Sequence, residues 1–206
     1  PFLSSIPGYF GLSWYSTGMV LIGMVTLFVG EIWALRQEDI KRMLAYSTIG
    51  QIGEITIVLG LTTVMGTTAA FYHILNHAVM KDLLFLCAGA LILRAGSRKL
   101  SDFKGACSQM PITCTCMLMG LLSIMGLPPF AAFYSKFAMI NAAVASGHIV
   151  VAAAILIGSL IGVLYYTRIL NTIIFEKRPA DAPVLHEAPK SMQYALMALA
   201  FATLLF

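Results

Sequence analysis

The sequence predicts an all-α membrane protein with about six transmembrane helices, one of them broken near Gly126–Pro129. Hydrophobic residues make up 59% of the 206 residues and charged residues only 11%, with a mean hydropathy of +0.87. Such a composition is far from that of a soluble domain. Apolar runs long enough to cross a bilayer recur between short polar connections. The net charge of +4 comes from basic residues scattered through these connections, which argues against nucleic acid as a partner.

The first two predicted helices flank a short charged loop. Residues 1–15 are expected to enter at the membrane interface, where aromatic side chains are enriched. The first helix is expected over Ser16–Leu35 and the second over about Met43–Val64. Glu54 falls near the middle of the second helix, where a carboxylate is costly and needs a partner or a function. Four further polar residues of this helix can hold water or form helix–helix hydrogen bonds: Tyr46, Ser47, Thr48 and Gln51.

The third helix, expected over about Ala69–Leu93 after an uncharged turn at Met65–Thr68, carries a row of titratable side chains. His73, His77 and Lys81 are spaced i, i+4, i+8, so they share one helix face. Lys81 lies near the middle of the span, too far from either interface for its side chain to reach water. The row therefore indicates a path for protons or ions.

Two other roles stay open for these side chains. Lys81 can form a permanent salt bridge, with the adjacent Asp82 or with Glu54. His73 and His77 have the spacing of a metal site, but no glutamate follows His73 and no third ligand is apparent. Proton exchange is the preferred interpretation, because a buried lysine and two histidines offer successive relay steps.

Four cysteines are expected to be reduced and structural. Cys87, Cys107, Cys114 and Cys116 lack zinc spacing, and three of them lie in apolar surroundings. Cys114 and Cys116 are expected to point to different faces of one helix. The sequence therefore assigns no metal site.

A helix break is predicted within the apolar stretch 111–146. Gly126, Pro128 and Pro129 interrupt this stretch, and each proline pushes the preceding residue out of the α region. We therefore expect two half-helices joined by an unwound segment. Lys136 follows two turns later, and unwound backbone at membrane depth is tolerated only beside protein or a water-lined cavity. Together the break and the lysine indicate an ion path; a packing kink with an outward-reaching lysine is the alternative.

The remaining helices are expected from Gly147 to about Phe175 and from near Ser191 onward. The connections near Gly66 and Gly147 contain no basic residue. Most basic residues fall in the connections after the first, third and fifth helices: Arg36, Lys41, Arg42, Arg94, Arg98, Lys99, Lys104, Lys177, Arg178 and Lys190. By the positive-inside rule these connections face the cytoplasm, or the matrix or stroma in an organelle, and the N-terminal end of the chain faces outward. Arg168 is expected to reach the basic side as an anchor.

Three motifs in this chain together resemble one protein family. They are Asp39-Ile40-Lys41-Arg42-Met43-Leu44-Ala45-Tyr46-Ser47-Thr48-Ile49-Gly50-Gln51-Ile52-Gly53, then His73-x-x-x-His77-Ala78-x-x-Lys81, then Gly126-Leu127-Pro128-Pro129-x-x-x-Phe133-x-Ser135-Lys136. In this order they resemble the antiporter-like membrane subunits of the complex I superfamily. That superfamily includes NADH:quinone oxidoreductases, energy-converting membrane-bound hydrogenases and multisubunit Na+/H+ antiporters.

The resemblance implies a fold of two inverted five-helix repeats, each with one broken helix. Residues 1–175 would be the second repeat, and 190–206 would start the following helix. The chain 1–206 is thus expected to be a single transmembrane domain from the C-terminal half of a longer protein, because the first repeat is missing.

The resemblance also implies roles for individual residues. Lys81 would be the central lysine of the membrane axis, and His73 and His77 its neighbouring histidines. Lys136 would be the residue of the second broken helix, where some members carry glutamate. Glu54 cannot be matched to a position in every branch of the family. It stays a candidate proton-transfer residue because of its depth in the membrane alone.

The function implied is proton translocation through His73, His77 and Lys81 to Lys136, driven by redox chemistry elsewhere in a complex. No ligand set for haem, flavin, nucleotide or Fe–S cluster is apparent, so this chain is not expected to catalyse electron transfer itself. The resemblance implies that partner subunits carry Fe–S clusters with flavin or a NiFe centre. Other membrane subunits, lipid, protons and Na+ are the expected partners, in a bacterial or archaeal inner membrane. A subunit of a multisubunit Na+/H+ antiporter and a non-conducting scaffold are the alternatives.

Overall fold

The computed structural model describes residues 13–179 and 183–205, and in these ranges the chain is helical and contains no strand. The α-helices are α1 (Trp14–Leu35), α2 (Ile40–Gly60), α3 (Val64–Ala95), α4 (Pro111–Ile124), α5 (Ala131–Ala145), α6 (Ile149–Leu170) and α7 (Lys190–Leu205). Shorter helical segments are η3 (Leu100–Phe103), η4 (Ala106–Ser108) and the π-helical η5 (Asn171–Phe175). Most of the interfacial segment predicted for residues 1–15 lies outside the described residues.

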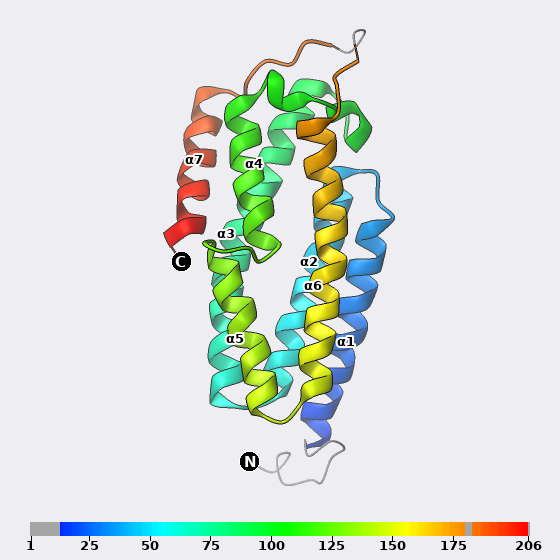
Figure 1. Ribbon diagram of the computed structural model, residues 1–206, viewed down its shortest axis with the longest axis vertical. Helices are drawn as coiled ribbons and strands as arrows, with labels where there is room; N and C mark the ends of the chain where they lie inside the picture. The colour runs from blue at the N-terminus through cyan, green and yellow to red at the C-terminus, as the bar shows by residue number, and fades with distance from the viewer. Residues whose placement is uncertain (1–12, 180–182, 206) are drawn as a thin grey trace.

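The helices run along one common axis (Figure 1). α4 and α5 follow one another along this axis, so that the two short helices together match the length of α3 or α6 (Figure 1). Three helices of the described part are long and apolar enough to cross a membrane: α1, α2, and α6 with η5. Counting the bent pair Leu100–Ser108 and Pro111–Ile124 as one span gives up to four. The expectation of six spans stays a prediction.

Side-chain caps set the boundaries of the first three helices. Asp39 accepts hydrogen bonds from the backbone amides of Lys41 and Arg42, at 2.8 and 3.1 Å, and so begins α2. The hydroxyl of Thr63 accepts from the amide of Gly66 at 3.0 Å and begins α3. The turn predicted at residues 65–68 is therefore wrong: it lies at residues 61–63, because the Thr63 cap draws the first turn of α3 forward.

The predicted helix break is present between α4 and α5. The chain leaves helical geometry over residues 125–130, which include Gly126 at φ 77° and both prolines. The side-chain amide of Asn76 in α3 donates to the carbonyl oxygen of Ala131 at 3.2 Å. This hydrogen bond fixes the start of α5 against α3, while residues 127–129 of the break itself are exposed on the surface of the described bundle.

The connections rich in basic residues meet at one end of the bundle, at the top of Figure 1. The amide of Leu100 donates to the carbonyl of Glu38 at 2.8 Å, and the amide of Gly105 donates to the carbonyl of Thr172 at 3.1 Å. The carboxylate of Glu187 accepts from the amide of Ile112 at 2.8 Å and so caps α4 from the last connection. The sequence grouping of these connections on one side is reproduced, while the side of the membrane that they face stays a prediction.

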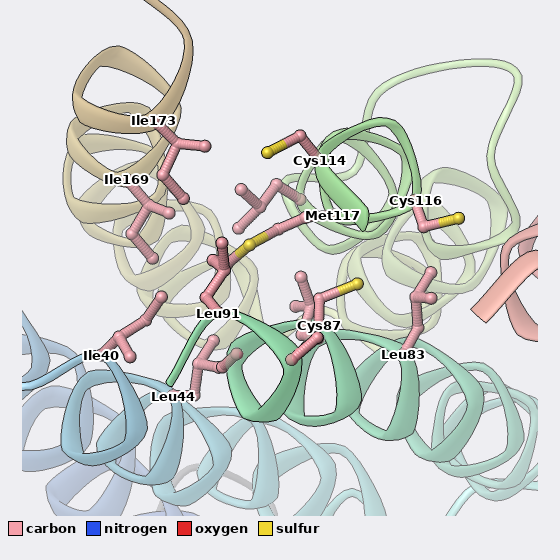
Figure 2. Packing of buried hydrophobic residues seen from close by; sticks show 14 of the residues in the cluster. Ile40, Leu44, Leu83, Cys87, Leu91, Cys114, Cys116, Met117, Ile169 and Ile173 are labelled. Carbon is pink, nitrogen blue, oxygen red and sulfur yellow. The ribbon is translucent and has the colours of Figure 1, made fainter. Parts of the chain in front are cut away.

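The apolar core consists of two clusters. The larger cluster lies toward the basic end and packs α2, α3, α4 and α6 together (Figure 2). The second cluster lies toward the opposite end and contains residues such as Leu27, Ile57 and Ile155. On each of α2, α3, α5 and α6, buried polar residues or glycines separate the positions that belong to one cluster from those of the other.

Glycines bring α1 and α2 into backbone contact. A Cβ atom added at Gly53 would lie 2.7 Å from the Cα of Leu27, and one added at Gly30 would lie 2.8 Å from the Cα of Gly50. Both positions therefore have no room for a side chain. Close packing through small residues is a common means of holding membrane helices together.

We predict that Gly53→Ala lowers the free energy of unfolding of the full-length protein by about 1–3 kcal/mol, because the added methyl group forces α1 away from α2. Gly18→Ala is the matched control, since nothing lies within 4 Å of the methyl group that it adds. Denaturant unfolding in detergent measures both variants. Equal stability of the two variants would contradict the backbone contact.

Candidate functional site

A layer of buried polar side chains crosses the bundle between the two apolar clusters. Helices far apart in the sequence contribute to it at the same depth. Its members are Glu31 of α1; Ser47, Gln51 and Glu54 of α2; His73, Asn76, His77 and Lys81 of α3; Ser135 and Lys136 of α5; and Ser159 of α6. All are buried except Ser159, which is half-buried. Because polar groups are costly at membrane depth, this layer is the candidate functional site.

His73 joins three helices at the centre of the layer. The imidazole is fully buried; its Nδ1 lies 2.9 Å from the hydroxyl of Ser135 and its Nε2 lies 3.2 Å from the amide oxygen of Gln51. Because an amide oxygen can only accept, Nε2 carries the proton. Nδ1 of the neutral ring can then accept from the hydroxyl of Ser135, which otherwise donates to the carbonyl of Ala132 at 3.2 Å. Both ring nitrogens therefore have a partner, and Nδ1, the nitrogen without a proton, faces the broken helix.

Lys136 and Glu54 form the buried ion pair of the layer. Their Nζ and Oε2 atoms are 3.5 Å apart, and the hydroxyl of Ser159 bridges them, accepting from Lys136 at 2.9 Å and donating to Glu54 at 3.2 Å. Only 7% of Lys136 and none of Glu54 is exposed, so Lys136 does not reach outward. The partner of Glu54 is thus Lys136 of the broken helix, and not Lys81.

Lys81 is held by uncharged groups instead. Its ammonium group donates to the carbonyl of Leu44 at 3.0 Å and to the hydroxyl of Ser47, and lies 5.8 Å from the ring centroid of Tyr166. The adjacent Asp82 is exposed. The salt bridges proposed for Lys81 are therefore absent from the described ranges, and its charge is neutralised by no carboxylate within 4.0 Å.

His77 lies between His73 and Lys81 on the same helix face. Its ring centroid is 6.1 Å from that of His73. Its Nε2 atom is buried and has no hydrogen-bond partner among the described residues. The spacing i, i+4, i+8 thus places the three side chains as predicted, and His77 has an unused polar atom in the interior.

Sequence reasoning missed Glu31, which is fully buried at the edge of the layer. Tyr165 donates to its Oε2 at 2.9 Å, and Gln51 donates to its Oε1 at 3.4 Å. Gln51 therefore contacts Glu31 on one side and His73 on the other. The signal was present in the sequence, because Glu31 is the one charged residue of the 22-residue helix α1.

A cavity of about 210 Å³ lies between α5 and α6, next to the helix break. Gly126, Lys136 and Ser159 contribute to its wall, together with apolar residues such as Phe133 and Phe137. This volume is enough for several water molecules. Its polar side is the Lys136–Ser159 contact, and most of the remaining wall is apolar, so Lys136 of the broken helix borders this space.

Three cysteines belong to the larger apolar cluster: Cys87, Cys114 and Cys116. Cys114 and Cys116 lie on different sides of α4 (Figure 2), and none of the cysteines in the described ranges is disulfide-bonded. Within the described part, no three side chains of the types that bind metal converge.

Comparison with known proteins identifies relatives of this chain. A family model described as "NADH:quinone oxidoreductase/Mrp antiporter, TM" matches residues 3–162. An NADH-quinone oxidoreductase subunit L of Mycobacterium tuberculosis is 37% identical over 187 residues, covering 88% of this chain and 29% of the relative. A Na(+)/H(+) antiporter subunit A1 of Staphylococcus haemolyticus is 31% identical over 213 residues, covering 91% and 26%.

A solved structure shows the same fold. A chain of the membrane-bound sulfane sulfur reductase, an archaeal respiratory membrane complex, superposes with a TM-score of 0.87 at 35% identity, covering 92% of this chain and 31% of that one. The motif-based resemblance and the antiporter-like membrane fold are confirmed, and the chain is an integral membrane protein. It spans less than half the length of the curated relatives named here.

We predict that Lys136→Met and Glu54→Gln each lower the free energy of unfolding of the full-length protein by about 3–5 kcal/mol, because each leaves a buried group of the ion pair without its partner. The double variant is expected to recover most of the loss. Denaturant unfolding in detergent measures all three.

The half-buried pair Lys104–Glu176, with 2.9 Å between Nζ and Oε2, is the control. Removing the charge of Glu176 is expected to change stability far less, because solvent screens this pair. A double variant of Lys136 and Glu54 as unstable as the sum of the single variants would contradict the pairing.

Proposed function

Because the chain belongs to the NADH:quinone oxidoreductase/Mrp antiporter transmembrane family, we propose that it conducts protons through the buried polar layer as a subunit of a larger membrane complex. The observation that carries the proposal is the continuity of the layer. Polar side chains of α2, α3 and α5 are linked by hydrogen bonds through His73, with Gln51 on one side and Ser135 on the other, and a cavity borders Lys136. Closed structural salt bridges would not need this continuity.

The layer supplies the steps of a proton relay. His73 can take up a proton on Nδ1, which faces Ser135, and Ser135 precedes Lys136 in α5. Lys81 and His77 extend the row along α3. Each step moves a proton between groups that bind protons reversibly, and the hydroxyls of Ser47, Ser135 and Ser159 hold the amines and the imidazole in place.

Glu54 couples proton occupancy to structure. When Lys136 is protonated, the ion pair with Glu54 is neutral as a whole; when Lys136 releases its proton, Glu54 keeps an uncompensated charge. A buried charge without a partner is unfavourable, so the pair then favours a rearrangement or a new proton. A change in a neighbouring subunit that alters the field at this pair would therefore drive protons onward.

The similarity to these relatives supports a wider proposal. We place the chain in a second five-helix repeat over residues 1–175 with a further helix from 190, and with six spans in all. Redox partners carrying Fe–S clusters with flavin or NiFe would supply the energy, and the basic connections would face the cytoplasm of a bacterium or archaeon.

Sodium exchange is the second candidate function, because this chain is also similar to a Na(+)/H(+) antiporter subunit. Na+ prefers carboxylate and carbonyl oxygens as ligands. Glu54 is the carboxylate nearest to Lys136, and its carboxylate would bind either Na+ or a proton. Dependence of transport on external Na+ at fixed pH separates the two functions.

We predict that Lys136→Ala and Lys81→Ala each lower proton translocation by about 100-fold or more, since each removes a relay group. The measurement is proton uptake by proteoliposomes that contain the complete complex. Lys41→Ala is the matched control, because Lys41 is exposed at the basic end of α2. If both buried lysines can be removed without loss of uptake in an assembled complex, the chain is a scaffold and the proposal fails.

A further inference from the structure

We propose that Glu31 is a further proton-binding site of this subunit, through which the polar layer exchanges protons toward the basic end of the bundle. The inference rests on the proposed function, since it adds a branch to the same relay. Glu31 carries it because the carboxylate is buried, lacks a counter-ion and contacts the layer through a single side chain.

The position of Glu31 is not that of a surface carboxylate. None of the residue is exposed, whereas the neighbouring Ile32 and Trp33 are about half exposed on the outer side of α1. The helix therefore turns its one charged side chain away from the exterior and into the bundle. Keeping a carboxylate there is costly, which indicates a function for the group.

The partners of Glu31 are neutral. Tyr165 donates to Oε2 at 2.9 Å and Gln51 donates to Oε1 at 3.4 Å. Among the described residues, no lysine, arginine or histidine lies within 4.0 Å of its oxygens. A carboxyl group with hydrogen-bond donors but no ion-pair partner can gain and lose a proton without breaking a salt bridge.

Two glycines of neighbouring helices leave space for the carboxylate of Glu31. A side chain at Gly50 of α2 would overlap Oε1 of Glu31, and a Cβ atom at Gly162 of α6 would lie 3.4 Å from Oε2. Neighbouring helices thus leave space for this group on two sides. The carboxylate is held in one place, as a group that exchanges protons with a fixed neighbour must be.

Glu31 is linked to the polar layer on one side and lies close to the end of α1 on the other. Gln51 contacts both Glu31 and His73, so its amide positions the two groups relative to each other. Toward the basic end, Glu31 lies four residues before Leu35, the last residue of α1, which is about one helix turn. On proton uptake, one carboxylate oxygen forms an O–H bond and the site becomes neutral; on release, the bond breaks and the proton passes to solvent or to the layer.

We predict that Glu31→Gln lowers proton uptake per turnover by about tenfold or more, because the amide keeps the shape of the side chain but cannot bind a proton reversibly. Glu31→Asp is expected to restore part of the uptake. Proteoliposomes with the complete complex give the uptake rate. Glu38→Gln is the matched control, since Glu38 is exposed in the connection after the same helix.

Infrared difference spectra of the same complex give a readout that a structural role would not change. The carbonyl band of a protonated carboxyl group is expected to change with turnover in the wild type, to vanish in Glu31→Gln and to persist in Glu38→Gln. Wild-type uptake with an unchanged band in Glu31→Gln would overturn the inference. If Glu31→Gln does not assemble, Glu31→Asp decides: a displaced band supports the inference and an unchanged band rejects it.

The two proposals fail in different ways. Full uptake in Lys81→Ala and Lys136→Ala rejects the proposed function itself. Loss of uptake in these variants combined with wild-type behaviour of Glu31→Gln rejects only the role of Glu31 and leaves the relay through His73 in place.

Discussion

Charged side chains in the apolar middle of this bundle need partners inside the protein, and the packing of the whole chain meets this need. Lys136 has Glu54 and Ser159, and Lys81 has the Leu44 carbonyl and Ser47. These contacts come from different helices, so each charged group holds at least two helices at a fixed depth. The polar layer thus sets the alignment of α2, α3, α5 and α6, while the two apolar clusters stabilise the bundle on either side of it.

The irregular segments serve the same arrangement. The break after α4 lets α5 begin at the depth of the layer, so that Ser135 and Lys136 reach His73 and Ser159. A continuous helix would instead cross the layer along one line and place fewer of its side chains there. At the basic end, Glu187 caps α4 across a long sequence separation and fixes where this helix starts.

Local patterns predicted much of this structure. The i, i+4, i+8 spacing placed His73, His77 and Lys81 on one buried face, and the prolines placed the break. The turn before α3 was misplaced, because Leu61-Thr62-Thr63 has no glycine or proline and its turn depends on one hydroxyl cap. Which carboxylate pairs with which lysine could not be predicted, since Glu54 and Lys136 meet only through tertiary packing. The omission of Glu31 was different: a single carboxylate in an apolar helix is visible in sequence.

The two apolar clusters also have an electrical consequence. They lie on opposite sides of the polar layer along the helix axis, and both consist of apolar side chains. A charge that moves sideways from helix to helix stays among polar groups, whereas one that moves straight across the membrane must pass through hydrocarbon side chains. In this arrangement the two apolar clusters therefore oppose the direct passage of an ion across the bundle.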